Sequence, residues 1–244
     1  MKNTYELNNI NENYEKKPLL DSEKIYSPKQ KFFAELIGTT ILIFVIELFG
    51  SIKYRNFGSM ISQGDLVLIP ITFLFGKISG AHFNPAISLA MFLRKKIIFS
   101  ELGYYIGAQI LGSLIGSLFV FLCLQGDIEY MYYNYKQFSK GSKIGIYFAI
   151  LGFDVFFTFI YVLVFFATNI KRKKYWPLYG SFIGITFYVV SSFSYLVSLN
   201  PMRMFFPNII GAIKEKGNVG IIFIELIGPF IGAIAAGFMS ILFE

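Results

Sequence analysis

The chain has 244 residues, of which 55% are hydrophobic and only 15% are charged, with a formal net charge of +7. Ordinary globular chains carry about 25% charged residues, so this composition is typical of a membrane protein, and its 29 phenylalanines and 16 tyrosines exclude a disordered chain. One cysteine and one histidine exclude a disulfide framework and a Cys/His zinc site, and we expect neither a metal nor a cofactor.

Polar and apolar stretches divide the chain. Residues 1–31 are rich in Asn, Glu, Lys and Tyr and predict a flexible N-terminal tail. Six long apolar runs follow, and a helix of about 20 residues crosses the ~30 Å hydrocarbon core of a bilayer. Because only helices and closed barrels satisfy the backbone in lipid, runs of this length predict transmembrane helices. They cover residues 32–51, 66–79 (with a start as early as 61), 104–124, 144–168, 178–198 and 219–243.

Two further apolar segments, 80–93 and 199–210, are too short to cross a membrane. Each contains an Asn-Pro box, Asn84-Pro85-Ala86 in the first and Asn200-Pro201-Met202 in the second. Asn is a preferred N-cap and Pro is favoured at the first position of a helix. Each box therefore predicts the start of a half-helix, which at ~1.5 Å per residue reaches only part of the way through the bilayer.

The sequence also contains an internal repeat. Each half, 32–124 and 144–243, holds three predicted crossings and one half-helix, and an odd number of crossings inverts the second half. The predicted fold is an all-α membrane protein, with six transmembrane helices and two re-entrant half-helices in one channel domain over 32–243. A spacing of 116 residues separates Asn84 from Asn200, Gly112 from Gly228, and Gly116 from Gly232.

The basic residues indicate the orientation. Thirteen Lys and Arg residues fall on the side of the two termini and seven on the opposite side. This excess predicts that both termini are cytosolic, in the plasma membrane or an internal membrane. Since the basic residues lie between apolar runs, the positive charge does not indicate nucleic-acid binding.

The inverted repeat brings the two half-helix N-termini face to face near the bilayer centre. Each N-terminus carries roughly half a positive charge, and the amides of Asn84 and Asn200 can donate hydrogen bonds. Such a site repels protons and cations but binds the oxygen of an uncharged solute. The boxes therefore predict a pore.

The two boxes, with Arg203 directly after Met202, resemble those of the aquaporin superfamily, and the resemblance extends over residues 32–243. It implies a passive channel for water in each subunit of a homotetramer, with or without glycerol and other small uncharged solutes, and no enzymatic activity. His82, Glu35 and Asp154 would support the loops that lead to the boxes.

The resemblance also implies an outer constriction formed by Gly64, Tyr188, Val197 and Arg203. Gly64 stands where water-selective members carry an aromatic residue, which favours solutes as large as glycerol. Met204, however, stands where the glycerol-conducting branch carries Asp, so the sequence leaves the choice of solute open. The alternative is a junctional or structural membrane protein of low permeability that keeps this fold, because Met202 and Tyr188 are large enough to narrow the pore.

Overall fold

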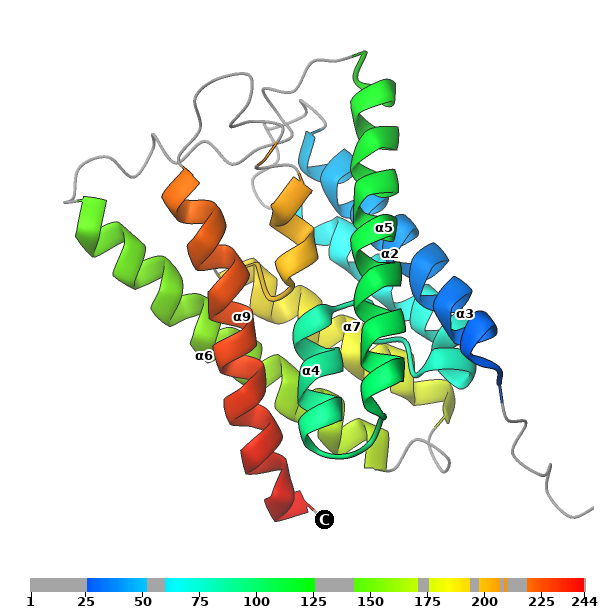
Figure 1. The fold of residues 1–244 in the computed structure, drawn as a ribbon. Coiled ribbons are helices and arrows are strands. Elements are labelled where there is room, and N and C mark those ends of the chain that lie inside the picture. Colours follow the sequence, from blue (N-terminus) through cyan, green and yellow to red (C-terminus); the bar gives the residue numbers. More distant parts are fainter. Residues whose placement is uncertain are drawn as a thin grey trace, which may run out of the picture.

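The structure is a computed structural model that describes residues 26–51, 60–125, 143–170, 176–193, 198–206, 209 and 219–243. All regular secondary structure in these residues is helical, as predicted (Figure 1). Residues 201–206 are also helical. The elements are α2 (Pro28–Ser51), η1 (Met60–Val67), α3 (Leu68–Ser79), α4 (Pro85–Leu93), α5 (Phe99–Cys123), α6 (Lys143–Ile170), α7 (Trp176–Phe193), α9 (Val219–Met239) and η3 (Ser240–Phe243).

The predicted crossings agree with these helices. In the described part of the chain, α2, α5, α6 and α9 are long and apolar enough to span a membrane, and α7 contains a shorter apolar helix. The second predicted crossing consists of two parts, because the 3₁₀ helix η1 continues directly into α3. The sequence located this crossing but did not predict its change of helix type.

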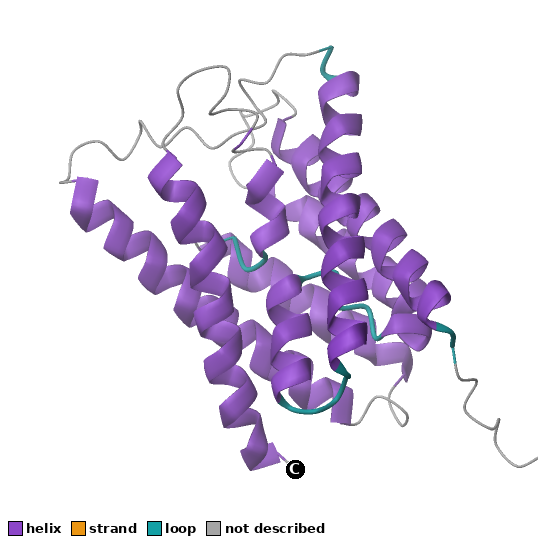
Figure 2. Cartoon of the chain, in the orientation of Figure 1, coloured by secondary structure: helices purple, strands orange, loops and turns teal. Residues whose placement is uncertain are grey.

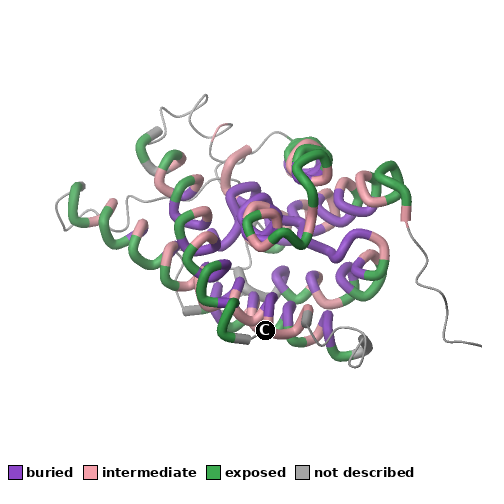
Figure 3. The backbone as a smooth tube through the Cα atoms, turned by 60° about the horizontal axis from the view of Figure 1, so that its bottom comes forward, coloured by how far each residue is buried: buried purple, intermediate pink, exposed green. Residues whose placement is uncertain are grey.

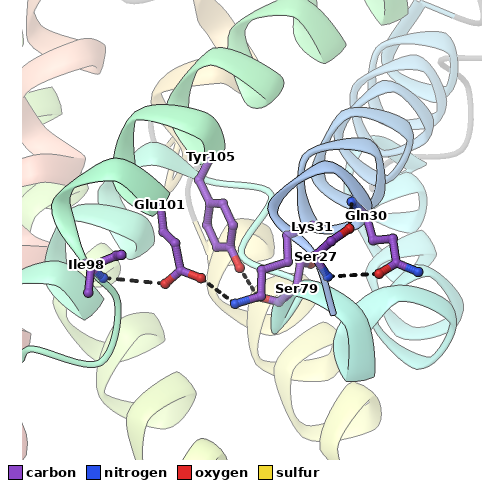
Figure 4. Close-up of polar contacts among 7 residues, drawn as sticks. All are labelled: Ser27, Gln30, Lys31, Ser79, Ile98, Glu101 and Tyr105. Atoms are coloured by element: carbon purple, nitrogen blue, oxygen red, sulfur yellow. Dashed lines mark hydrogen bonds and ion pairs between the residues drawn. The ribbon is translucent and has the colours of Figure 1, made fainter. Parts of the chain in front are cut away.

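The first helix begins earlier than predicted. Pro28 opens α2, whereas apolar content alone placed the end of the tail at residue 31. The backbone N–H of Ser27 donates to Gln30 Oε1 (2.9 Å), and the backbone N–H of Gln30 donates to Ser27 Oγ (3.3 Å). This reciprocal cap, together with Pro at the first helical position, stabilises a polar first turn (Figure 4).

Close packing of α5 on α2 depends on two glycines. A Cβ atom added to Gly112 would lie 2.6 Å from the Leu36 carbonyl oxygen, and one added to Gly116 would lie 2.8 Å from the Thr40 carbonyl oxygen. Neither position has room for a side chain. Small residues of this kind let helix backbones approach closely within a membrane.

The second half of the chain repeats this packing. Gly228 and Gly232 of α9 lie against α6, where added Cβ atoms would fall 2.7 Å from Asp154 Cβ and 2.3 Å from the Val155 carbonyl oxygen. Each glycine lies 116 residues after its counterpart in α5. The internal repeat in the sequence is therefore also a repeat of helix packing.

The interior of the bundle contains the short helices. Figure 3 shows buried positions concentrated in the middle of the molecule and exposed positions around its outside. Large apolar side chains, such as Phe73, Phe148 and Phe238, are exposed on the outer faces of the helices, as expected where helices meet lipid. Figure 2 shows short loops that enter the bundle and lead to α4 and to the helix of residues 201–206.

Candidate functional site

Both Asn-Pro boxes start a helix. Asn84 is extended (φ −155°, ψ 118°) and its Oδ1 accepts a hydrogen bond from the Ala86 backbone N–H at 2.9 Å, with Pro85 in the first position of α4. Asn200 does the same for residues 201–206, because its Oδ1 accepts from the Met202 backbone N–H at 3.0 Å. Each asparagine therefore uses its side-chain oxygen to cap its own half-helix.

The same two side chains connect the boxes to each other. Asn84 Nδ2 donates to the Leu199 carbonyl oxygen and Asn200 Nδ2 donates to the Phe83 carbonyl oxygen, both at 2.8 Å. The two half-helices thus meet end to end inside the bundle (Figure 1). An amide nitrogen carries two hydrogens, and each of these bonds uses one of them.

The residues before the asparagines have matching backbone conformations. Phe83 (φ 48°) and Leu199 (φ 57°) are both in the left-handed region, which non-glycine residues rarely occupy. This conformation turns each carbonyl oxygen toward the asparagine of the opposite box. The two residues are 116 positions apart, so the symmetry of the site follows that of the sequence.

Glu35 of α2 binds the loop before the first box. Its Oε1 accepts from Ser79 Oγ (2.6 Å) and the His82 backbone N–H (3.0 Å). Its Oε2 accepts from the Phe83 backbone N–H (2.7 Å) and Gln109 Nε2 (2.9 Å). The side chain is fully buried.

His82 lies beside this carboxylate network and is buried. Its Nδ1 is 3.0 Å from Ser88 Oγ on α4. Its ring packs edge-on against Tyr105 and Phe165, with centroids 4.8 and 5.7 Å away. These contacts join the loop to α4, α5 and α6.

Asp154 of α6 takes the place of Glu35 in the second half. Its Oδ1 accepts from the backbone N–H groups of Ser198 (2.6 Å) and Leu199 (3.3 Å). Met202 is buried in the second box, and its carbonyl oxygen accepts from Ser113 Oγ of α5 at 2.7 Å.

Arg203 follows the second box and is almost fully buried, with 5% of its side chain exposed. Its Nη2 lies 3.4 Å from Oδ1 of Asp65, whose Oδ2 accepts a hydrogen bond from Ser191 Oγ. The guanidinium carbon is 5.7 Å from the centre of the Phe187 ring. Asp65 and Phe187 therefore flank the cation, and Ser191 holds the carboxylate of Asp65.

Two residues expected at the outer constriction, Gly64 and Tyr188, are the sequence neighbours of the residues that contact Arg203. Gly64 faces α2, where an added Cβ atom would lie 3.0 Å from Ile46 Cα. Tyr188 is half-buried, and its carbonyl oxygen accepts from Ser191 and Ser192. Val197 lies outside the described residues.

Sequence reasoning missed Asp65 and Phe187. Asp65 had a detectable signal, because a carboxylate in an apolar membrane segment requires a cationic or polar partner. Phe187 had none, since an additional aromatic residue in this chain is unremarkable.

The opposite end of the bundle contains a second set of polar contacts (Figure 4). Lys31 at the start of α2 forms an ion pair with Glu101 at the start of α5. Tyr105 donates to the Ser79 carbonyl oxygen at 2.6 Å, which joins α5 to the end of α3. No group of three or more metal-binding side chains occurs in the described ranges.

Comparisons with known proteins agree with this geometry. The family model described as "Major intrinsic protein" matches residues 21–240. The chain is 28% identical to "Probable aquaporin NIP4-2" of Arabidopsis thaliana, covering 91% of this chain and 77% of the relative. It is also 28% identical to "Glycerol uptake facilitator protein-like 6" of Lactiplantibacillus plantarum, covering 86% of this chain and 96% of the relative. The fold resembles the crystal structure of the aquaglyceroporin from Plasmodium falciparum, with a TM-score of 0.69 at 18% identity over 87% of this chain and 95% of that one.

Proposed function

Because this chain belongs to the major intrinsic protein family and is a membrane channel for water or small solutes, we propose that uncharged molecules pass between its two boxes while protons and ions are excluded there. One observation carries the proposal. Asn84 and Asn200 bind each other's loops at 2.8 Å, so both side-chain amides lie at the meeting point of two helix N-termini.

Exclusion of protons follows from the electrostatics of that point. A water molecule there accepts hydrogen bonds from the amides through its oxygen and turns its hydrogens away in both directions. The positive ends of the half-helices oppose hydronium and other cations. A chain of waters cannot then relay a proton past the boxes.

We assign supporting roles to the side chains around the boxes. Glu35, Asp154 and His82 hold the two loops in place, so that the asparagines keep their orientation. Pro85 and Ala86 begin one half-helix, and Pro201 and Met202 begin the other. For the outer constriction we propose Arg203 with its contacts Asp65 and Phe187, together with Val197.

We propose glycerol as a second permeant beside water. Support comes from a relative named as a glycerol uptake facilitator. The absence of an aromatic side chain at Gly64 adds no support, because Gly64 packs against α2.

A paired swelling assay tests the function. Proteoliposomes that contain the protein are expected to shrink faster than empty vesicles in an impermeant osmolyte, and to re-swell when the osmolyte is glycerol. Fast shrinkage without re-swelling in glycerol would indicate a channel that conducts water but not glycerol. Rates equal to those of empty vesicles in both arms would contradict the proposal and favour a structural membrane protein.

We also propose a homotetramer in which each subunit contains its own pore. The N-terminal tail ends before Pro28, the channel domain extends from α2 to residue 243, and both termini lie in the cytosol. Lys31 pairs with Glu101, and Arg94 Nε donates to Ser240 Oγ at 3.2 Å. These contacts place the beginning of α2 and the helix η3, which follows α9, at the same end of the bundle.

A further inference from the structure

The surroundings of Arg203 contain a donor and an acceptor that are not fully used. Within the described part of the chain, Nη1 of Arg203 and Oδ1 of Asp65 have no hydrogen-bond partner, although both atoms are buried. The ion pair between the two side chains is long, at 3.4 Å. A buried polar group without a partner is costly, so an unpaired donor and an unpaired acceptor at the same place point to a bound molecule.

The acid is held in a defined position. Ser191 of α7 donates to Oδ2 of Asp65, which leaves Oδ1 on the side of Arg203. Asp65 is fully buried in η1. A carboxylate and a guanidinium at this depth require each other, because either one alone in the membrane interior is strongly unfavourable.

An apolar surface completes the arrangement. The Phe187 ring lies 5.7 Å from the guanidinium carbon and packs edge-on against Tyr161 at 5.1 Å. The site therefore offers a donor, an acceptor and an aromatic wall. An arginine without this acid would offer only donors at this place.

We infer that Asp65 is a specificity-determining residue, which with Arg203 forms a donor–acceptor pair that selects small uncharged solutes carrying both a hydrogen-bond donor and an acceptor. A hydroxyl or amide N–H of the solute donates to Asp65, and its oxygen accepts from Arg203. Its carbon skeleton or flat face lies against Phe187. Polyols and urea share this chemistry. The inference rests on the proposed channel function and concerns selectivity within it.

The test compares flux ratios in proteoliposomes. Wild type, Asp65→Asn and Asp65→Leu are each assayed for water, glycerol and urea. Asp65→Leu removes the acceptor at similar size, so the solute-to-water ratio should fall about tenfold, the factor that corresponds to one hydrogen bond to a charged group. Asp65→Asn keeps an oxygen but loses the charge and should show a smaller fall. The glycerol and urea arms show which of the two solutes the pair selects.

Thr72→Val is the matched control. Thr72 lies seven residues after Asp65, is fully buried, and its hydroxyl has no hydrogen-bond partner among the described residues. This variant should leave the glycerol-to-water and urea-to-water flux ratios unchanged. Size-exclusion chromatography in detergent checks that each variant is folded, and if Asp65→Leu is not, Asp65→Asn carries the test alone.

The outcomes separate this inference from the channel function. A fall in the glycerol or urea ratio with Thr72→Val unchanged supports it. Unchanged or raised ratios in Asp65→Asn, or an equal loss of water and solutes, would overturn it while wild-type water flux upholds the channel. A wild type that conducts neither water nor solute would overturn the proposed function, and this inference with it.

Discussion

At the scale of single residues, buried carboxylates accept the hydrogen bonds of loop N–H groups that lack a helical carbonyl partner. The loop from Gly80 to Phe83 contains two non-glycine residues with positive φ, Ala81 and Phe83, and forms no helix. Its N–H groups must still be satisfied, because lipid and a packed interior offer no alternative. Glu35 accepts two of them, and Asp154 does the same for the second loop.

Removing the first acid should destabilise the protein. We expect Glu35→Ala to leave several buried donors without an acceptor, at about 1–3 kcal/mol each. Glu35→Gln keeps one acceptor oxygen and the same shape, and should lose less stability. The measurement is the temperature at which half of the folded peak is lost in detergent size-exclusion chromatography.

The control for this pair is Ser100→Ala, at an exposed position at the start of α5. It should match the wild type. A Glu35→Ala variant as heat-resistant as wild type would show that the loop does not depend on this carboxylate.

At the scale of elements, α5 acts as a central support. Polar side chains recur every fourth residue along one of its faces, and each contacts a different residue of α2, α3 or the second box. Its first contact is the ion pair with Lys31 near the beginning of the helix, and its last is a hydrogen bond from Ser117 to Glu47 on α2. The face consists of Glu101, Tyr105, Gln109, Ser113 and Ser117.

The glycines of α5 divide into two kinds. Gly116→Ala should destabilise the protein by about 1–3 kcal/mol, because overpacking forces the helices apart. Its Cβ would lie 2.8 Å from the Thr40 carbonyl oxygen. Gly107→Ala meets nothing within 4 Å and should be neutral or stabilising, by up to about 1 kcal/mol from helix propensity. Chemical denaturation in detergent compares the two, and equal effects would contradict the close contact between α2 and α5.

At the scale of the whole molecule, the two ends of the bundle are marked by different residues. One end contains the Lys31–Glu101 pair and the Arg94–Ser240 contact. Cys123, at the end of α5, lies toward the other and is exposed. A helix from Phe99 to Cys123 is long enough to place its ends on opposite sides of a membrane.

This asymmetry gives a test of orientation. With both termini in the cytosol, an impermeant maleimide should label Cys123, the only cysteine of the chain, on intact cells. In the variant Cys123→Ser with Ser100→Cys, labelling should require permeabilised cells. The reverse pattern would invert the proposed topology.

The amino-acid sequence by itself determined the crossings, the two half-helices and their inverted repeat. Long apolar runs, Asn-Pro caps and a constant spacing of 116 residues are local or periodic signals. They can be recognised without knowing which residues pack together in the fold. Only the tertiary structure decided which side chains surround Arg203. Successive residues are rotated by about 100° around the axis of an α-helix and by about 120° around that of a 3₁₀ helix. Because η1 is a 3₁₀ helix, counting residues back from the first box does not show whether Gly64 or Asp65 faces Arg203. The same shift of one position separates Tyr188 from Phe187, because the rotation of α7 is set by its packing against its neighbours.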